Sequence, residues 1–432
     1  MKNTFHVFML LILVLCNCLE VHAQERQVKI IVTPNHDNWI YKAGEEATFE
    51  ITVLKSFVPV KNAKIYYEIG LERMTPMKKD SMVLPMGKTT LNAGTLKEPG
   101  FLRCIVTIRL DNINYRGLAT AGFEPTAIHA YAVMPEDFKS FWDNGKKELA
   151  KIPMDAKMVL LPERCTEKTN VYHVNLQGYG RNSRLYGILG VPKKEGKYPA
   201  LLRVPGAGIR PYNGELGFAE KGIITFEIGI NGIPVNLDPQ VYTSLANGAL
   251  SGYQNFNIDD KDRFYYKRVY LNCIRANDFL ASLPQYDGSN LGVIGGSQGG
   301  ALSIVTASLD SRVKYLSAMF PALSDLTATL RGRTGGWPNY FDKWGISYNN
   351  TPEKIATLGC YDVVNFAKQL TVPGINSWGF NDEVCPPSST YAAYNSINAP
   401  KLLFIYPETG HWDIPEQNEK MGSWIVEQLK EK

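Results

Sequence analysis

The chain has 432 residues, of which 44% are hydrophobic and 20% are charged, and its formal net charge is +4. This composition supports ordinary buried cores, so it excludes a disordered chain, and so small a net charge gives no support to nucleic-acid binding. The length predicts more than one domain.

The first 23 residues have the pattern of a secretory signal peptide. A lysine precedes an apolar run over Phe5–Leu15, and the small residue Ala23 marks the expected cleavage site. The run is too short for a permanent membrane span, and no later stretch is long and apolar enough, so we expect an exported chain, periplasmic or secreted. A lipid anchor on Cys18 is the less favoured form, because Asn17 stands where a small residue is expected.

The stretch from residue 24 to about residue 127 predicts a β-domain. Short segments of alternating apolar and polar residues, such as ATFEITVL and GFLRCIVTIRL, are separated by turn residues. Several short strands at this spacing are typical of an immunoglobulin-like β-sandwich. No catalytic grouping falls in this region, so we expect a packing or spacer module rather than a specific sugar-binding domain.

The cysteines and histidines give no sign of a metal site. Beyond the signal peptide the cysteines are scattered, odd in number and without C-x-x-C spacing, and no H-E-x-x-H motif occurs. We therefore expect no metal, no cofactor and no disulfide framework; a single incidental disulfide bond is the alternative to fully free cysteines.

Residues 128–432 predict a second domain of a different class. Segments with helical spacing, above all an amphipathic helix over RFYYKRVYLNCIRANDFLASLP, alternate with short apolar strands such as YPALLRVPG and KLLFIYPE. Such alternation predicts a mostly parallel sheet that is covered by helices on both faces. The layout is that of an α/β-hydrolase.

The central motif of this domain is LGVIGGSQGGAL, from Leu291 to Leu302. An apolar strand, the turn G-x-S-x-G and an alanine-rich helix follow one another, which is the context of a nucleophile elbow. Ser297 would stand on the strained turn, with Gly295 and Gly299 leaving room for strand and helix to approach. The amide of Gln298 would lie at a helix N-terminus, where free N–H groups can hold an oxyanion.

The partners of the serine are expected in the order acid and then histidine. Asp382 follows the strand VPGINSWGF and His411 follows KLLFIYPE, both at carboxyl ends of strands, where open α/β sheets carry their sites. His411 would take the serine proton and Asp382 would hold the imidazole. Glu383 is the main rival acid and Asp413 a weaker one.

The second oxyanion donor is expected after an earlier strand of the sheet. The sequence LLRVPGAGIR has a flexible glycine turn there, and we assign the amide of Ala207 to the oxyanion hole.

An aromatic insertion is expected to limit the substrate. Residues 331–350 lie between the strand after the nucleophile and the strand that leads to Asp382, where α/β-hydrolases often carry a cap, and they hold five aromatic side chains: Trp337, Tyr340, Phe341, Trp344 and Tyr348. Together with Trp412 they would wall an acyl pocket that accepts acetyl and rejects long chains. Burial against the core is the alternative.

The catalytic half resembles the acetyl xylan esterase / cephalosporin-C deacetylase family. The matching stretches include PEDFKSFW, LYGILGVP, a long segment around the elbow, NDEVCPPSSTYAAYN and YPETGHW, and they cover most of residues 135–432. The resemblance implies removal of acetyl groups from sugars or similar small esters, with Ser297, Asp382 and His411 as the triad. It also implies that Gln298 and Ala207 supply the oxyanion amides.

The sequence departs from the family pattern around the pocket. Pro205-Gly206-Ala207 replaces the family's His-Gly-Tyr, Asn231-Gly232-Ile233 stands for its Arg-Gly-Gln, and Trp412 replaces the usual Glu after the histidine. Backbone amides survive such changes, so they concern pocket shape and substrate rather than hydrolysis. Family members often form ring-shaped oligomers, so the resemblance allows a homo-oligomer. The added N-terminal domain puts the ring-shaped assembly in question.

Three functions follow from these patterns. The first is a carbohydrate esterase that acts on acetylated oligosaccharides. The second is a hydrolase of other small esters or of amides, as in peptidases of this fold. The third is a non-catalytic, carbohydrate-binding relative, which an intact Ser297, Asp382 and His411 argues against. Fold alone does not decide between them.

Overall fold

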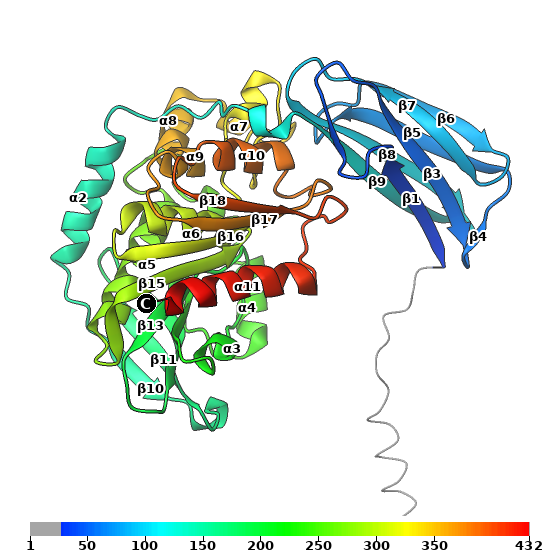
Figure 1. Ribbon diagram of the computed structural model, residues 1–432. Helices are drawn as coiled ribbons and strands as arrows, with labels where there is room; N and C mark the ends of the chain where they lie inside the picture. Colours follow the sequence, from blue (N-terminus) through cyan, green and yellow to red (C-terminus); the bar gives the residue numbers. More distant parts are fainter. Residues whose placement is uncertain (1–26, 432) are drawn as a thin grey trace, which may run out of the picture.

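A computed structural model describes residues 27–431 (Figure 1). The predicted signal peptide and the alternative lipid anchor on Cys18 lie outside the described residues. Within them, no helix combines the length and the hydrophobicity needed to cross a membrane.

The N-terminal strands form two sheets (Figure 1). One contains β1 (Val28–Pro34), β3 (Ala47–Lys55), β4 (Val58–Pro59) and β7 (Lys88–Gly94). The other has the order β2-β9-β8-β5-β6, formed by β2 (Ile40–Tyr41), β9 (Ile113–Phe123), β8 (Gly100–Leu110), β5 (Ala63–Leu71) and β6 (Lys78–Leu84).

The two N-terminal sheets share an apolar interior because their strands alternate. In β3, Ala47, Phe49 and Ile51 are fully buried, whereas the residues between them are partly or fully exposed. The sheets approach closely where β9 passes β1, since a Cβ added at Gly117 would lie 2.4 Å from the Ile30 carbonyl oxygen. Only glycine fits at that crossing.

The larger sheet has the order β10-β11-β12-β14-β13-β15-β16-β17-β18. The pairs from β10 to β14 are antiparallel, and those from β14 through β13 to β18 are parallel. Its strands are β10 (Lys157–Leu160), β11 (Thr169–Gln177), β12 (Arg184–Pro192), β13 (Tyr198–Arg203), β14 (Ile224–Gly229), β15 (Tyr286–Gly296), β16 (Val313–Met319), β17 (Gly374–Trp378) and β18 (Lys401–Ile405).

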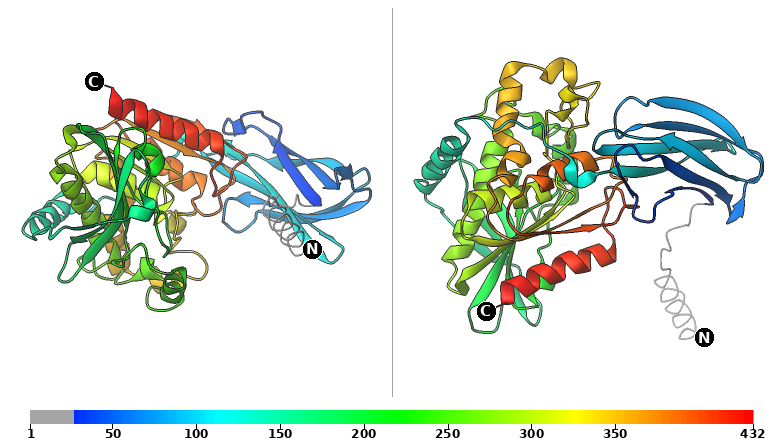
Figure 2. Two further views of the ribbon diagram at one scale, coloured as in Figure 1. Left: turned by 90° about the horizontal axis from the view of Figure 1, so that it is seen from below. Right: turned by 45° about the horizontal axis from the view of Figure 1, so that its top comes forward.

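Helices cover both faces of this sheet (Figures 1 and 2). Ile294 of β15 packs with Ile425 and Leu429 of α11, while Val293 belongs to the larger core on the opposite face. The helices are α2 (Phe138–Ala150), α3 (Leu216–Ala219), α4 (Pro239–Asn247), α5 (Tyr265–Ser282), α6 (Gln298–Leu309), α7 (Ile346–Asn349), α8 (Pro352–Tyr361), α9 (Val363–Ala367), α10 (Pro387–Asn395) and α11 (Pro415–Lys430). This is the α/β arrangement that the sequence predicts.

Helix α5 differs from its prediction as an amphipathic helix. Fourteen of its 18 residues are buried, because α5 packs against the sheet and against the neighbouring α6 and is covered by α2. Even Asn272 and Arg275 on this helix are buried, and both are used in hydrogen bonds, to Tyr179 N and to the Leu149 and Ile152 carbonyls. The polar positions therefore serve internal contacts rather than a solvated face.

The N-terminal sheets rest against one edge of the α/β part. They lie beside α10 and the loop that follows β17 (Figure 2), and Phe101 of β8 packs edge-on against Phe380 of that loop with ring centroids 5.0 Å apart. Because this loop also carries Asp382, the position of the N-terminal sheets bears directly on the candidate site.

Candidate active site

Ser297 lies on a strained turn between β15 and α6. Its φ of 59° and ψ of −125° are unusual for a residue with a side chain. A Cβ at Gly295 would lie 2.3 Å from the Gly299 carbonyl oxygen, and one at Gly299 would lie 2.4 Å from the Val204 carbonyl oxygen. Both glycines are therefore required for the close approach of strand, turn and helix that the sequence predicts.

Three predicted residues form a continuous hydrogen-bonded chain. His411 Nε2 lies 2.9 Å from Ser297 Oγ, and His411 Nδ1 lies 2.8 Å from Asp382 Oδ2. The residues follow β15, β17 and β18, so three parallel strands bring them to the same edge of the sheet. This geometry allows the imidazole to accept the serine proton while the carboxylate holds its other nitrogen.

The carboxylate of Asp382 is buried and fixed by its own loop. Its Oδ1 accepts hydrogen bonds from the amides of Val384 and Cys385, each at 2.8 Å, while Oδ2 faces His411. Since both oxygens are engaged, the carboxylate has one orientation, and that orientation follows the backbone of the loop.

The two rival acids point elsewhere. Glu383 accepts two hydrogen bonds from Arg116, at 2.7 and 2.8 Å. Its burial acts to raise its pKa, but Arg116 and the nearby Arg103 outweigh that effect and hold the pKa of Glu383 below its usual value. Asp413 is exposed and accepts a hydrogen bond from Asn418. Neither carboxylate is bonded to His411.

Both predicted oxyanion donors belong to segments that lie close to Ser297. Gln298 is the first residue of α6, so its amide precedes the first intrahelical hydrogen bond. Ala207 lines the same cleft as Ser297, and a Cβ at the neighbouring Gly206 would come within 4.0 Å of Ser297 Cβ. The glycine turn thus lies close to the nucleophile.

The side chain of Gln298 makes hydrogen bonds that the sequence does not predict. Its Oε1 accepts hydrogen bonds from the hydroxyls of Tyr253 and Tyr266, both at 2.9 Å, and its Nε2 contacts the Pro205 carbonyl at 3.4 Å. The Tyr253 hydroxyl also accepts a hydrogen bond from the Gly208 amide at 3.3 Å. These contacts tie the glycine turn to the elbow. Nothing in the sequence around Tyr253 indicates this contact, because the segment lies outside the motifs.

Ser297 and His411 open into a cleft of about 530 Å³. Its lining is apolar on some sides and polar on others: Met319, Phe320, Trp337, Val384 and Trp412 supply apolar surface, whereas Arg203, Arg210, Asp413 and Asn418 supply polar groups. The ring of Phe320 lies 4.8 Å from that of His411. Both predicted pocket residues, Trp337 and Trp412, are in this lining.

The aromatic residues of the insertion separate in the structure. Trp337 reaches the cleft, Tyr340 and Phe341 are buried in the core, and Trp344 and Tyr348 are about three-quarters exposed. The expectation that all five wall one pocket is therefore wrong. The predicted alternative, burial against the core, describes Tyr340 and Phe341, and the short α7 carries Tyr348 out toward solvent.

The described residues contain no group of three or more histidine, cysteine or acidic side chains arranged to hold a metal ion. The cysteines between residues 27 and 431 are all free thiols: Cys104, Cys165, Cys273, Cys360 and Cys385.

Comparison with known proteins identifies a matching family and a relative that aligns with nearly the whole chain. The acetyl xylan esterase (AXE1) family profile matches residues 126–428. The curated protein "Acetyl esterase Axe7A" from Xylanibacter ruminicola is 37% identical over 405 residues, which cover 93% of this chain and 90% of that protein. Since residues 1–125 make up more than a quarter of the chain, this relative shares most of the N-terminal sheets as well.

Two solved structures share the α/β part. An acetyl xylan esterase from Paenibacillus sp. R4 has a TM-score of 0.61 and 28% identity, and it covers 71% of this chain and 98% of its own. Acetyl xylan esterase 1 from Thermoanaerobacterium sp. JW/SL YS485 has a TM-score of 0.62 and 25% identity, with the same two coverages.

Proposed function

Because the chain belongs to the acetyl xylan esterase family, we propose that it is a serine esterase that removes acetyl groups from acetylated oligosaccharides. The observation that carries the proposal is the unbroken chain of hydrogen bonds from Ser297 Oγ through His411 to Asp382. Ser297 and His411 of this chain line an open cleft.

In the proposed mechanism Ser297 attacks the acetyl carbonyl carbon while His411 Nε2 takes the hydroxyl proton. The amides of Gln298 and Ala207 would donate to the oxyanion of the tetrahedral intermediate. His411 then returns the proton to the departing sugar oxygen, which leaves an acetyl-serine. A water molecule, deprotonated by the same imidazole, releases acetate and restores the serine.

The apolar and polar sides of the cleft indicate how the substrate would be oriented. We assign the acetyl methyl group to the apolar side formed by Phe320, Trp337 and Val384. The sugar would lie toward Trp412, whose ring is more than half exposed, and toward the polar groups of Arg210 and Asp413. An exposed aromatic ring beside hydrogen-bonding side chains suits the apolar face and the hydroxyl edge of a pyranose.

The domain division and the location of the protein form part of the same proposal. We assign residues 1–23 to a signal peptide that directs export, residues 24–127 to an immunoglobulin-like β-sandwich and residues 128–432 to the catalytic domain. The two sheets with a shared apolar interior support the second assignment.

A panel of substrates tests the function against its alternatives. The enzyme is assayed on chromogenic acetyl, butyryl and octanoyl esters and on a peptide amide, and it is treated with a serine-reactive phosphonate. The proposal predicts phosphonate labelling at Ser297 and a preference for the acetyl ester. Faster cleavage of the amide would favour a peptidase, and a protein that neither labels nor turns over any ester would favour a binding protein.

A further inference from the structure

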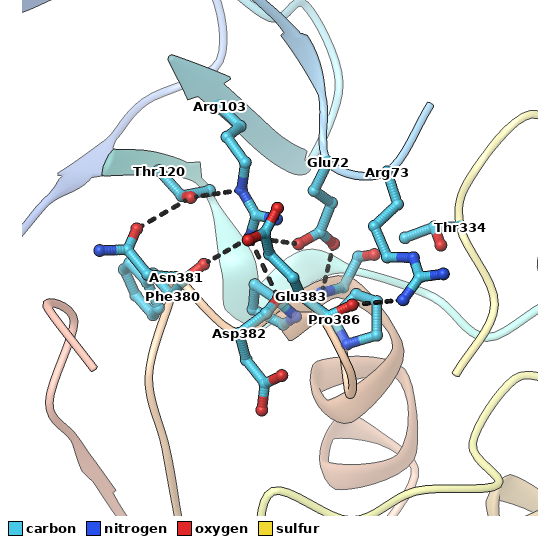
Figure 3. A network of polar contacts seen from close by, with 12 residues as sticks. Glu72, Arg73, Arg103, Thr120, Thr334, Phe380, Asn381, Asp382, Glu383 and Pro386 are labelled. Atoms are coloured by element: carbon cyan, nitrogen blue, oxygen red, sulfur yellow. Dashed lines mark hydrogen bonds and ion pairs between the residues drawn. The ribbon is translucent and has the colours of Figure 1, made fainter. Parts of the chain in front are cut away.

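The loop that carries Asp382 is held from two sides. On one side, the Phe380 amide donates to the Pro407 carbonyl and the Asn381 amide donates to the Thr409 carbonyl, each at 3.1 Å. These contacts join the acid loop to the segment that leads to His411. On the other side the loop faces strands β8 and β9 of the N-terminal sheets (Figure 3).

Arg103 of β8 makes the central contact on that second side. Its Nη2 donates to the carbonyl oxygens of Phe380 and Asp382, at 3.0 and 3.1 Å. Figure 3 shows the Asp382 carboxylate pointing away from the guanidinium, so Arg103 holds the backbone of this residue rather than its side chain. The Asp382 carboxylate is fixed by amides of its own loop. By binding the backbone of this loop, Arg103 therefore also fixes the position of the carboxylate.

The guanidinium is itself oriented by its surroundings. Thr120 is the direct cross-strand partner of Arg103; its hydroxyl accepts from Arg103 Nε at 2.8 Å and lies 3.1 Å from Asn381 Oδ1. Glu72 lies 3.8 Å from Arg103 Nη2 and accepts a hydrogen bond from the Ser388 amide at 2.8 Å. Arg103, Thr120 and Glu72 are all buried, so solvent does not screen these contacts.

A second set of contacts lies nearer the solvent. Arg116 of β9 binds the Glu383 carboxylate through both of its terminal nitrogens, and Arg73 donates to the Glu383 carbonyl. Arginine side chains of the N-terminal part thus bind the backbone carbonyls of Phe380, Asp382 and Glu383 (Figure 3).

The residues that contact the acid loop lie outside the part of the chain that the family profile matches. The family profile begins at residue 126, whereas Arg103, Thr120 and Arg116 precede it. The proposed triad therefore lies in the part that the profile matches. The contacts of Arg103, Thr120 and Arg116 with the acid loop, called the clamp below, come from the N-terminal sheets.

We propose that Arg103 is a positioning residue for the reaction: through the backbone of the acid loop it sets the position of Asp382 relative to His411. The N-terminal sheets then form a working part of the catalytic apparatus rather than a spacer. This inference rests on the proposed function, because it assigns Asp382 as the acid of the triad.

A purely structural contact would behave differently. If Arg103 served only to attach the N-terminal sheets, its loss would lower stability and leave turnover by the remaining folded enzyme unchanged. If it positions Asp382, turnover falls in enzyme that is still folded, while KM for a small ester changes little, because the residue touches no part of the cleft.

The test measures kcat, KM and thermal melting of the full-length protein on a chromogenic acetyl ester. The variants are Arg103→Met, Arg103→Lys and Thr120→Val, with Arg109→Met as a matched control on the same strand, since Arg109 is exposed and does not contact the acid loop. We expect Arg103→Met to lower kcat by up to about a hundredfold, the cost of a displacement of about 1 Å in a catalytic group. Arg103→Lys should recover part of this loss, and the control should keep the parent rate.

A second arm places Arg103→Met in an Asp382→Asn background. If Arg103 acts through Asp382, the further loss in this background is much smaller than in the parent, because residues that share one function are not additive. Equal losses in both backgrounds, or a parent kcat in Arg103→Met, would overturn the proposal.

The buried position of Arg103 calls for a safeguard. If Arg103→Met does not fold, Thr120→Val decides: it removes the acceptor of Arg103 Nε without leaving a charge unpaired, and an unchanged kcat would overturn the proposal. Phosphonate labelling of Ser297 in the parent is scored separately. A parent that labels and hydrolyses esters keeps the proposed function even when the Arg103 results reject the clamp.

Discussion

Replacement of Asp382 by asparagine should disable the histidine without removing it. Two backbone amides donate to Oδ1 of Asp382, from Val384 and Cys385, so the oxygen of the new amide must occupy that position. Its NH₂ group then faces His411 Nδ1, now 2.8 Å from a carboxylate oxygen. A donor at that place requires the tautomer with its proton on Nε2, which faces Ser297 and can no longer accept the serine proton.

The expected loss is about ten-thousand-fold in kcat, or about 5 kcal/mol in the activation free energy. It is measured on a chromogenic acetyl ester, with melting temperature as the check on folding. Glu383→Gln is the matched control, and we expect it to cost little, because this side chain does not contact His411 and a glutamine oxygen can still accept a hydrogen bond from Arg116. An Asp382→Asn enzyme within tenfold of the parent, or a greater loss in Glu383→Gln, would refute the assignment of the acid.

Two further predictions concern the cleft and the glycine turn. Trp337 borders the acetyl side of the cleft beside Ser297, so kcat/KM should fall steeply from acetyl to butyryl and octanoyl esters, and Trp337→Ala should flatten that fall. Equal rates on acetyl and octanoyl esters in the parent would reject this acyl wall. Tyr253→Phe removes the hydroxyl that joins Gln298 to the Gly208 amide. We expect a loss in kcat of about tenfold or more, because the oxyanion donors are held less firmly; complete loss of a donor costs roughly a hundredfold or more. An unchanged kcat would show that the glycine turn keeps its position without this hydroxyl.

The hydrogen-bonded residues of the proposed triad could be located from the sequence because each follows a recognisable strand. Ser297 lies in a glycine turn between an apolar strand and a helix, and His411 and Asp382 each follow a short apolar run. In a parallel sheet such positions meet at one edge by geometry alone. No knowledge of distant contacts is needed for that step, so local patterns are sufficient.

The clamp on the acid loop could not be predicted in the same way. Arg103 and Asp382 are separated by 279 residues, and nothing in an alternating strand reveals which of its charged side chains will face another part of the chain. Arg103 and Arg109 belong to the same strand, yet one is buried and the other exposed. Only the docking of the N-terminal sheets distinguishes them.

The aromatic insertion shows a related limit. Its composition predicts a pocket wall, with burial against the core as the alternative, but Trp344 and Tyr348 are exposed while Tyr340 and Phe341 are buried. The segment has no long regular element that would impose a periodicity, so the sequence carries no signal for which ring faces inward.

Release of acetate from acetylated xylo-oligosaccharides by the parent enzyme and by Ser297→Ala tests the proposed esterase function most directly. The parent should release acetate, and the variant should fold as the parent does and lose on the order of a million-fold in turnover, the usual cost of removing a triad nucleophile. A variant that keeps more than a few per cent of the parent rate, or a folded parent that releases no acetate, would contradict the central claim.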